Sequence, residues 1–461
     1  MKISELVTEL YTNLPDDKKP FIRSDGIFPL TQEDADVLDG IKIIGIAGSR
    51  GKTTTALMVH EYLKAKGHKS MLYCSAKIDS PASNIDPDEA SETPLLNLAI
   101  VLKLLLEALE YKPKFIVLEV HESAIQRGIV KDLPFTVRAL TNIYKDHHID
   151  QESSGDYVKN IKSFFKDVSA DGDSITVLGL TGDINKTNFQ ELLKINDKEK
   201  FTYSSQYTAE QKDVPINKLD AYLYFCEHSV WNMLTKFIVK GKDYVFETEL
   251  LMPFNAFNMT CAISILEALD IFCPEKFQDI IFGIISPGRE EIFRFNNRMV
   301  MLDVYLGPAL EILDEYKQRG EIDRIKVVTG ASGTGFLGWD DIFSSPAYIS
   351  ERGKFRKRAM DYLKNYADSV ILTTLDNANE DPLTICQELQ GYLGDSVESE
   401  IVLDRKEAIK KAILHAKEGD FIFIPGRGNR NVLVEGETEV TLLKDSEVIK
   451  EVIEELKPGG F

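Results

Sequence analysis

The sequence has few of the residues that build disulfide-rich proteins or zinc sites. Its 461 residues include five cysteines, and no two of these have the C-x-x-C spacing. A zinc site or a disulfide framework is therefore not indicated, and reduced thiols in a cytosolic protein are expected. The first 20 residues, MKISELVTELYTNLPDDKKP, carry acidic side chains early and lack an apolar centre, unlike a secretory signal peptide.

Long apolar runs and an excess of positive charge are also missing. The most apolar stretch, LLNLAIVLKLLLEALE from Leu95, contains Lys103 and Glu107 and is too short and too charged to span a bilayer. The formal net charge of -20 argues against a general nucleic-acid-binding surface. We therefore expect neither a membrane nor a nucleic acid as a partner. An anionic substrate would need a local positive site, together with metal.

The composition indicates a globular protein of two or three domains. Hydrophobic residues make up 43% and charged residues 28% of the chain, which is too long for one ordinary core. Short β-branched runs alternate with longer helical patterns, which predicts an α/β fold with parallel sheets covered on both faces. The predicted strands are IKIIGIA, KFIVLEV, VRALTNI, DSITVLGL, RIKVVTGA, SVILTTLD and DFIFIPG.

The breaks in this alternation predict the domain boundaries. Residues 1–38 are polar and weakly patterned, and PDDKKP within them is expected to be a loop. A nucleotide-binding domain is predicted over 39–285 and a second α/β domain over 286–461, because ISPGREEIF interrupts the pattern with Pro and Gly. Six predicted strands end in polar or glycine-rich residues: GSRGKT, EVHES, TNIYKDHH, GASGTG, LDNAN and PGRGN. Ligands bind at the carboxyl ends of parallel strands, so these loops are the candidate sites.

The loop GSRGKT is typical of a phosphate-binding loop. It follows a predicted strand and opens a predicted helix, so backbone N–H groups can turn toward phosphate oxygens. It departs from the full G-x-x-x-x-G-K-[ST] motif, because Ile46 stands at the position of the first glycine. Lys52 is expected to reach the terminal phosphates and Thr53 to ligate magnesium. The predicted nucleotide-binding residues of this loop are Gly48, Ser49, Arg50, Gly51, Lys52, Thr53 and Thr54.

Two further strand ends carry candidate metal ligands. Glu119 ends the apolar strand KFIVLEV, where a buried carboxylate needs a partner such as magnesium. The loop TNIYKDHH places His147 at the end of another strand, where an imidazole can complete such a site. A salt-bridged carboxylate and a surface histidine are the alternative interpretations of these two residues.

The order GSRGKTTT, LEV, TNIYKDHH, FNAFN, PGRE, D-x-Y, LDNANEDP, DRKEAI and PGRGN resembles the Mur ligase family from about Ile41 to Arg430. These are ATP-dependent amide ligases, and the chain looks most like the branch that adds the third residue of the cell-wall stem peptide. The resemblance implies a central P-loop ATPase domain and a Rossmann-like C-terminal domain. It also implies that a carboxylate takes the γ-phosphate of ATP and that an amine then displaces phosphate.

Site residues follow from the resemblance, position by position. Lys52 and Thr53 match the phosphate-loop positions, and Glu119 and His147 match magnesium ligands. Asn258, with Asn255 beside it, matches an adenine contact, Arg289 matches a nucleotide-contacting arginine, and Asp303 matches the acid that holds the ribose. Lys52, His147 and Lys162 are the candidate catalytic residues. The incoming amino acid is expected at Asp376, Asn377, Asn379, Gly426 and Arg430.

The sequence departs from the family at four places. About forty residues precede the phosphate loop, where full-length members carry a domain that binds a UDP-sugar. EVHESAI replaces EVSSHAL. Family members often carry a carbamylated lysine in the helix after the DH motif. The spacing of Lys159 and Lys162 differs by one residue from the spacing of that lysine, and a shift of one residue rotates a helical side chain by ~100°. Finally, Asn379 and Arg430 stand where diaminopimelate-adding members have an arginine and a glutamate.

These departures leave several functions open. The expected product is an extended peptidoglycan or pseudomurein precursor peptide, formed from an amino acid and a peptide or UDP-peptide by a cytoplasmic monomer. A poly-γ-glutamate or folylpolyglutamate ligase is one alternative, and a non-catalytic ATP-binding regulatory protein is another. Glutamate is favoured as the amino acid if Arg430 points into the site, whereas lysine or a neutral amino acid is equally open if it points to solvent. Diaminopimelate is expected to be a poor substrate.

Overall fold

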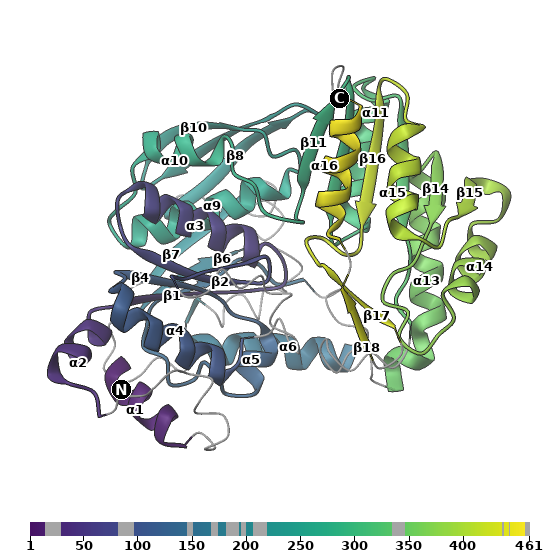
Figure 1. Cartoon of the computed structure of the whole chain (residues 1–461). Coiled ribbons are helices and arrows are strands. Elements are labelled where there is room, and N and C mark those ends of the chain that lie inside the picture. The colour runs from purple at the N-terminus through teal and green to yellow at the C-terminus, as the bar shows by residue number, and fades with distance from the viewer. Residues whose placement is uncertain are drawn as a thin grey trace. The chain divides into compact units, whose positions relative to one another are not determined.

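The structure, a computed structural model, forms two compact units. It describes residues 1–13, 29–81, 96–144, 151–166, 174–180, 193–194, 200–205, 219–333, 346–435, 438–441 and 443–456. Unit 1 comprises Met1–His228 and Asn232–Ile284, and unit 2 comprises Ser229–Trp231 and Ile285–Phe461. Each unit is a sheet flanked by helices, which confirms the predicted α/β class (Figure 1). Among the described residues, no helix has the length and apolarity needed to cross a membrane.

Unit 1 is built on a ten-stranded sheet with the order β10-β9-β8-β7-β6-β5-β1-β4-β2-β3. The strands from β8 to β2 in this order are parallel, and antiparallel strands close both edges. The strands are β1 Lys42–Ala47, β2 Ser70–Cys74, β3 Lys77–Asp79, β4 Phe115–Glu119, β5 Phe135–Leu140, β6 Ile175–Gly179, β7 Lys200–Ser205, β8 Ala221–His228, β9 Met233–Val239 and β10 Lys242–Thr248.

Helices cover both faces of this sheet, as the apolar strands predicted. Successive residues of β1 alternate between the faces, so Ile44 and Ile46 join one core and Ile43 and Ala47 join the other. The first core includes side chains of α3 Lys52–Ala65, α9 Phe254–Ala268 and α10 Pro274–Ile281. The second includes side chains of α1 Ile3–Asn13, α2 Gln32–Asp39, α4 Leu98–Tyr111, α5 Glu122–Gln126 and α6 Gln151–Lys166.

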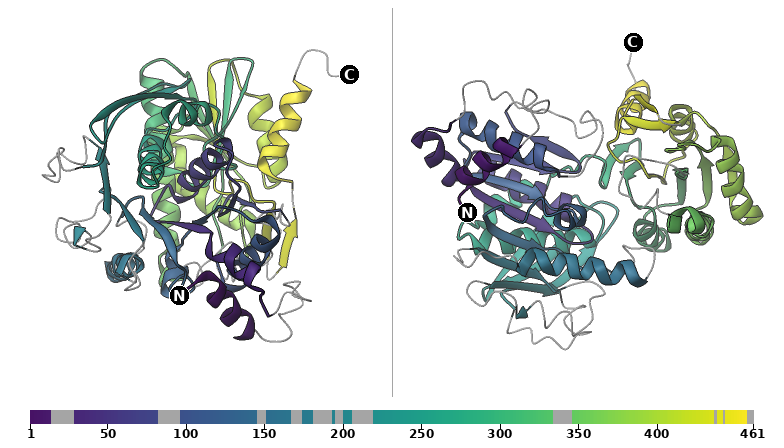
Figure 2. Two further views of the ribbon diagram at one scale, coloured as in Figure 1. Left: turned by 90° about the vertical axis from the view of Figure 1, so that its left-hand side faces the viewer. Right: turned by 90° about the horizontal axis from the view of Figure 1, so that it is seen from below.

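The amino-terminal residues are more regular than the sequence suggested. Although residues 1–38 are weakly patterned in sequence, α1 and α2 form in this region and pack on α4 (Figures 1 and 2). Ile3, Leu6 and Val7 are buried at helical spacing and join the core of unit 1. Thr31 and the side chain of Asp34 form a capping box that starts α2. The PDDKKP segment lies outside the described residues.

Unit 2 contains a six-stranded sheet with the order β11-β12-β16-β13-β14-β15, in which only the β11–β12 pairing is antiparallel. Its strands are β11 Glu291–Phe295, β12 Arg298–Asp303, β13 Arg324–Thr329, β14 Ser369–Leu372, β15 Glu398–Ile401 and β16 Asp420–Pro425, followed by the hairpin β17 Val432–Glu435 and β18 Thr438–Thr441. Its helices are α11 Gly307–Gln318, α13 Pro346–Tyr366, α14 Pro382–Leu393, α15 Arg405–Leu414 and α16 Asp445–Glu455, with a 3-10 turn at Gly394–Ser396.

Short polar side chains fix where several helices begin. The Asn97 side chain accepts a hydrogen bond from the Ile100 N–H at the start of α4. Asp381 caps α14 in the same way, directly before a proline, and Asp404 caps α15. The last two caps fix the starts of the helices that follow β14 and β15.

All five cysteines are free thiols. Cys74, Cys261 and Cys386 are buried, whereas Cys226 and Cys273 are partly buried. Burial raises the pKa of the Cys261 thiol to about 12 and that of the Cys386 thiol to about 11. Thiols with such pKa values hold little thiolate at neutral pH and react slowly.

Candidate functional site

The predicted phosphate loop joins β1 to α3. Gly48 and Gly51 have φ angles of 135° and 80°, which L-residues with a side chain rarely adopt. Gly51 precedes the first turn of α3, whose backbone N–H groups have no partner within the helix. Lys52 is buried, and its ammonium donates to the carbonyl oxygens of Gly48 at 2.9 Å and Ser49 at 3.3 Å. The lysine therefore lies over the loop, as phosphate binding requires.

The loop that follows β5 holds the phosphate loop by its backbone. The Asn142 side chain accepts from the Arg50 N–H at 3.0 Å and donates to the Arg50 carbonyl at 3.0 Å. Thr141 Oγ1 donates to the same carbonyl at 2.7 Å. A Cβ atom added at Gly48 would lie 2.2 Å from Thr141 Oγ1, so only glycine fits there. The side chains of Thr141 and Asn142 thus hold the loop in place, and these contacts do not involve the backbone N–H groups at the amino terminus of α3.

A carboxylate and two hydroxyls meet beside this loop. Thr53 Oγ1 donates to the Glu119 carboxylate, with distances of 3.1 and 3.0 Å to its two oxygens, and lies 2.8 Å from Ser75 Oγ. The Ser75 N–H also donates to Glu119 at 2.7 Å. His121 Nε2 lies 3.5 Å from the same carboxylate. These oxygens are hard ligands of the kind that Mg²⁺ prefers, so the residues fit that ion.

The other predicted metal ligand, His147, lies outside the described residues. Among the described residues, the structure therefore brings together Thr53 and Glu119 of the predicted metal set. Ser75 and His121 were not predicted as members of this site. His121 lies in EVHESAI, the segment that stands where other family members have EVSSHAL. This difference was the signal in the sequence that the site is altered here.

Helix α6 is tied to the phosphate loop through Tyr157. Ser49 Oγ lies 2.9 Å from the Tyr157 hydroxyl and accepts from the Tyr144 N–H at 2.9 Å. The guanidinium of Arg50 lies 5.0 Å from the centre of the Tyr144 ring. Lys162 is half-buried, one turn further along this helix, and the neighbouring candidate Lys159 is exposed.

The two predicted adenine-contacting residues lie in the first turns of α9. Asn258 donates to the Asn255 side chain at 2.8 Å, and both residues are buried. A Cβ atom added at Gly51 would lie 1.9 Å from Asn258 Oδ1, so the asparagine directly adjoins the phosphate loop. Thr54 is half-buried in the first turn of α3. The predicted nucleotide residues of unit 1 thus occupy one end of the sheet.

In unit 2, the remaining predicted nucleotide residues, Arg289 and Asp303, form a second group. Asp303 is buried at the end of β12 and accepts from the N–H groups of Val304 and Tyr305. Burial raises the pKa of this carboxyl group, although Arg289 and backbone N–H groups oppose the shift. The Arg289 guanidinium lies 5.5 Å from the centre of the Tyr305 ring. Gly288, in the turn before β11, has a φ of 64°.

The predicted amino-acid residues come from the loops after β14 and β16. Arg430 donates to the Asp376 carboxylate, and the exposed fractions of the two side chains are 11% and 8%. Asn377 is buried next to Asp376, whereas Asn379 is exposed. The N–H of Gly426 donates to the Asp303 carbonyl at 2.9 Å, which joins this loop to β12. Arg430 therefore points toward the neighbouring loop and not into solvent.

Two family models match the chain. The Mur ligase middle domain matches residues 46–266, and the Mur ligase glutamate ligase domain matches residues 309–428.

The chain belongs to the Mur ligase family.

It is accordingly an ATP-dependent, ADP-forming amide ligase. The UDP-N-acetylmuramoyl-L-alanyl-D-glutamate--2,6-diaminopimelate ligase of Aquifex aeolicus is 25% identical over 424 residues, which are 90% of this chain and 77% of that protein.

Solved structures show the same fold. A UDP-N-acetylmuramoyl-L-alanyl-D-glutamate--2,6-diaminopimelate ligase superposes with a TM-score of 0.59 at 19% identity, covering 90% of this chain and 78% of that one. Folylpolyglutamate synthase of Mycobacterium tuberculosis, complexed with ADP, gives a TM-score of 0.58 at 15% identity and covers 92% and 95%.

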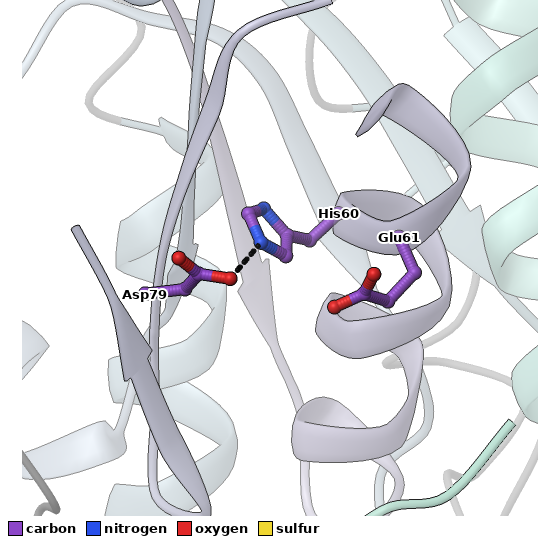
Figure 3. A group of neighbouring side chains, drawn as sticks. All are labelled: His60, Glu61 and Asp79. Carbon is purple, nitrogen blue, oxygen red and sulfur yellow. Dashed lines mark hydrogen bonds and ion pairs between the residues drawn. The ribbon is translucent and has the colours of Figure 1, made fainter. Parts of the chain in front are cut away.

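This Mur ligase also has a group of titratable side chains near its phosphate loop helix. His60 and Glu61 on α3 lie near Asp79 on β3, and His60 Nε2 is 3.1 Å from Asp79 Oδ2 (Figure 3). Lys64 and Lys77 approach the same oxygen at 3.0 and 3.1 Å. Two ammonium groups thus occupy the position that a metal ion would need, so the group is an ion-pair network.

Replacing Asp79 by asparagine should destabilise unit 1 of the Mur ligase by about 1–3 kcal/mol at neutral pH. The hydrogen bond from His60, with those from Lys64 and Lys77, lowers the pKa of Asp79 despite its burial. A carboxylate whose pKa is lower in the folded state stabilises the fold fully above the unfolded pKa of ~3.9, and this contribution declines below that pH until it is lost as the pH falls through the lower folded-state pKa. Thermal melting at pH 7 and at successively lower pH values below 4 should show a difference from wild type that shrinks as the pH falls. Glu61→Gln is the control with a smaller expected effect, because the half-buried Glu61 pairs with Lys64 and Lys77 at 3.6 and 3.3 Å.

Proposed function

We propose that the chain forms an amide bond between a cell-wall precursor peptide and an amino acid, with ATP and Mg²⁺. The observation that supports this most strongly is the phosphate loop, in which Thr53 donates to the buried Glu119 carboxylate. A phosphate-binding loop beside a hard oxygen cluster is the arrangement that nucleotide-dependent phosphoryl transfer uses. The similarity to a ligase whose name specifies UDP-N-acetylmuramoyl-L-alanyl-D-glutamate supports a UDP-peptide acceptor.

Each unit has its own part in the proposed reaction. Unit 1, with the predicted domain 39–285, binds ATP through residues 48–54 and orients the γ-phosphate with Lys52. Bound Mg²⁺, held by Thr53 and Glu119, would neutralise charge on the phosphates. Unit 2, with the predicted domain 286–461, carries the predicted nucleotide contacts Arg289 and Asp303 and holds the amino acid with the loops after β14 and β16.

The proposed chemistry has two balanced steps. A carboxylate oxygen of the acceptor attacks the γ-phosphorus, so that a P–O bond forms, the bond to ADP breaks and an acyl phosphate results. The neutral amine of the amino acid then attacks the acyl carbon, and inorganic phosphate leaves as the amide forms and the amine loses a proton. The acyl phosphate forms on the acceptor and is consumed by the amine. Repeated turnover of ATP therefore depends on both substrates.

The test is phosphate release by the full chain with ATP and Mg²⁺. UDP-N-acetylmuramoyl-L-alanyl-D-glutamate serves as the acceptor, and separate assays contain glutamate, glutamine, lysine, alanine or diaminopimelate. Release is expected only when acceptor and amino acid are both present, with a product of the matching mass. Tetrahydrofolate with glutamate tests the folylpolyglutamate alternative. ATP hydrolysis that ignores every acceptor and every amino acid would favour the regulatory ATPase and overturn the proposal.

A further inference from the structure

Arg289 lies at the end of a tight turn, 286–289, shortly before β11. The Arg289 N–H donates to the Ser286 carbonyl oxygen at 2.9 Å, which closes the turn. Proline followed by glycine is the residue order of a type II turn, whose third position needs a positive φ, and Gly288 has a φ of 64° there. Glu290 also has a positive φ, of 50°, which is costly for a residue with a side chain. Both neighbours of Arg289 therefore need contacts that hold their conformation.

Two buried carboxylates supply such contacts, one on each side of Arg289. Glu291 Oε2 accepts a hydrogen bond from the Gly288 N–H at 2.9 Å. Asp303, at the end of β12, accepts from the Glu290 N–H. The proposed function gives Asp303 a task at the nucleotide, whereas it gives none to Glu291. The role of Glu291 therefore has to be sought in the turn that it holds.

The Glu291 carboxylate has few other contacts. Its side chain is 10% exposed, and among the described residues its one ion pair is with the exposed Lys450, at 4.0 Å. Burial raises the pKa of Glu291, while the Gly288 N–H and Lys450 oppose this shift. A buried carboxylate is costly unless it accepts hydrogen bonds. The bond from the Gly288 N–H is thus the main short contact that compensates the burial of Glu291.

The two glycines Gly288 and Gly428 bring the turn against a neighbouring loop. A Cβ atom added at Gly288 would lie 2.0 Å from the Asn429 N atom. A Cβ atom added at Gly428 would lie 2.8 Å from the Gly288 carbonyl oxygen and 2.9 Å from Val304 Cγ1. The turn is therefore packed between the loop after β16 and the residue that follows Asp303. Packing limits where the turn lies, and the hydrogen bond at its third residue limits how that peptide is rotated.

We propose that Glu291 is a positioning residue, which orients the Arg289 guanidinium for the nucleotide by holding the Gly288 N–H. The proposal rests on the proposed function, in which Arg289 contacts the nucleotide. The guanidinium lies 5.5 Å from the centre of the Tyr305 ring, and its charge acts on Asp303. A rotation of the Gly288 peptide would move the Arg289 backbone and turn its side chain away from these neighbours. Guanidinium hydrogen bonds are directional, so a small displacement weakens them strongly.

The expected effects separate positioning from general stability. Glu291→Leu removes the acceptor and should weaken binding of the ATP analogue AMP-PNP with Mg²⁺ by ~10-fold. Glu291→Gln keeps an acceptor oxygen at the same distance along the side chain and should bind within ~2-fold of wild type. Arg289→Ala should weaken binding by ~10- to 100-fold. Adding Glu291→Leu to Arg289→Ala should cause no further loss, because no guanidinium is then left to orient.

Glu321→Leu is the matched control in unit 2. The half-buried Glu321 also accepts from a backbone N–H, that of Val230, at 2.7 Å, but Val230 is remote in sequence from the turn 286–289. The variant should lower the melting temperature to a similar extent as Glu291→Leu and leave binding of AMP-PNP unchanged. A purely structural role of Glu291 would make the two variants alike in both measurements.

The experiment is isothermal titration calorimetry of the full chain with AMP-PNP and Mg²⁺, for wild type and each variant, together with thermal melting. Hydrogen exchange of peptides that cover 286–290 should become faster in Glu291→Leu and stay at the wild-type rate in Arg289→Ala. Unchanged binding by Glu291→Leu, an equal loss in Glu291→Gln, or losses that multiply in the double variant would overturn the proposal. If Glu291→Leu does not fold, Glu291→Asp, whose carboxylate is one methylene shorter, takes its place in the same comparison.

The outcomes also distinguish this inference from the proposed function. If Arg289→Ala weakens binding and the losses multiply, the inference fails and the nucleotide contact of Arg289 stands. If Arg289→Ala binds AMP-PNP as wild type does, that contact fails and the inference fails with it. If the double variant matches Arg289→Ala but no acceptor and amino acid support phosphate release, the inference stands and the proposed ligase reaction fails.

Discussion

ATP turnover should fall by about 10²- to 10³-fold when Lys52 is replaced by alanine, while the fold persists. The Lys52 ammonium lies over the phosphate loop, 2.9 Å from the Gly48 carbonyl oxygen. The protein has a net charge of -20 and repels a polyanion such as ATP unless a local positive charge compensates. Losing the positive charge of Lys52 should therefore weaken both ATP binding and phosphoryl transfer. ADP production and binding of fluorescent ATP report the two effects.

Lys66→Ala is the matched control, because Lys66 is an exposed lysine at the other end of the same helix. It should leave turnover and melting unchanged. Wild-type turnover in a normally melting Lys52→Ala protein would show that the loop does not bind phosphate through this side chain. Loss of turnover together with a collapsed melting temperature would instead assign Lys52 a structural role through its two carbonyl contacts.

Glu119→Gln should raise the Mg²⁺ concentration needed for half-maximal turnover by at least ~10-fold and lower turnover by ~10²-fold. Glu119 is buried, and its carboxylate already accepts from the hydroxyl of Thr53 and the N–H of Ser75. The amide is almost isosteric but carries no charge, so the oxygen cluster should keep its shape and lose its attraction for a cation. Mn²⁺ binding measured by electron paramagnetic resonance provides a readout that does not depend on turnover.

Glu110→Gln, at the exposed end of α4, controls for the loss of one negative charge from unit 1. It should change neither metal affinity nor turnover. If Glu119→Gln binds Mn²⁺ as tightly as wild type, Glu119 is not a metal ligand, and its role is structural, through contacts such as its hydrogen bonds to Thr53 and Ser75.

Strand positions and strand-end loops were the most predictable features of the molecule. Each of the seven predicted runs overlaps an observed strand, because continuous β-branched segments have few other ways to bury their side chains. Parallel strands bring their carboxyl ends to one edge, which explains why Thr53 and Glu119 meet although 66 residues separate them. The roles of these residues stay predictions until they are tested.

Other features depend on contacts between residues far apart in the sequence, which no local sequence pattern predicts. The direction of Arg430 is set by Asp376, 54 residues away, and the clamp on the phosphate loop is set by Asn142, 92 residues from Arg50. Helix α1 was missed for a different reason: its apolar residues have helical spacing, but the many polar residues around them hid the pattern. Strands β8 and β9 were not predicted either, although β8 begins with the apolar run AYLYFC and the positions of β9 alternate between buried and partly buried.

The distribution of the cysteines makes the two units separately observable. Cys386 is buried in α14 and is the only cysteine of unit 2, because the other four lie in unit 1. A thiol reagent can reach it only when that part of the chain opens, so its labelling rate measures the opening free energy of unit 2. Cys261 in α9 supplies the same measurement for unit 1. Peptide mass spectrometry of one labelled wild-type sample can then tell which unit a nucleotide stabilises and which an amino acid stabilises, without a single substitution.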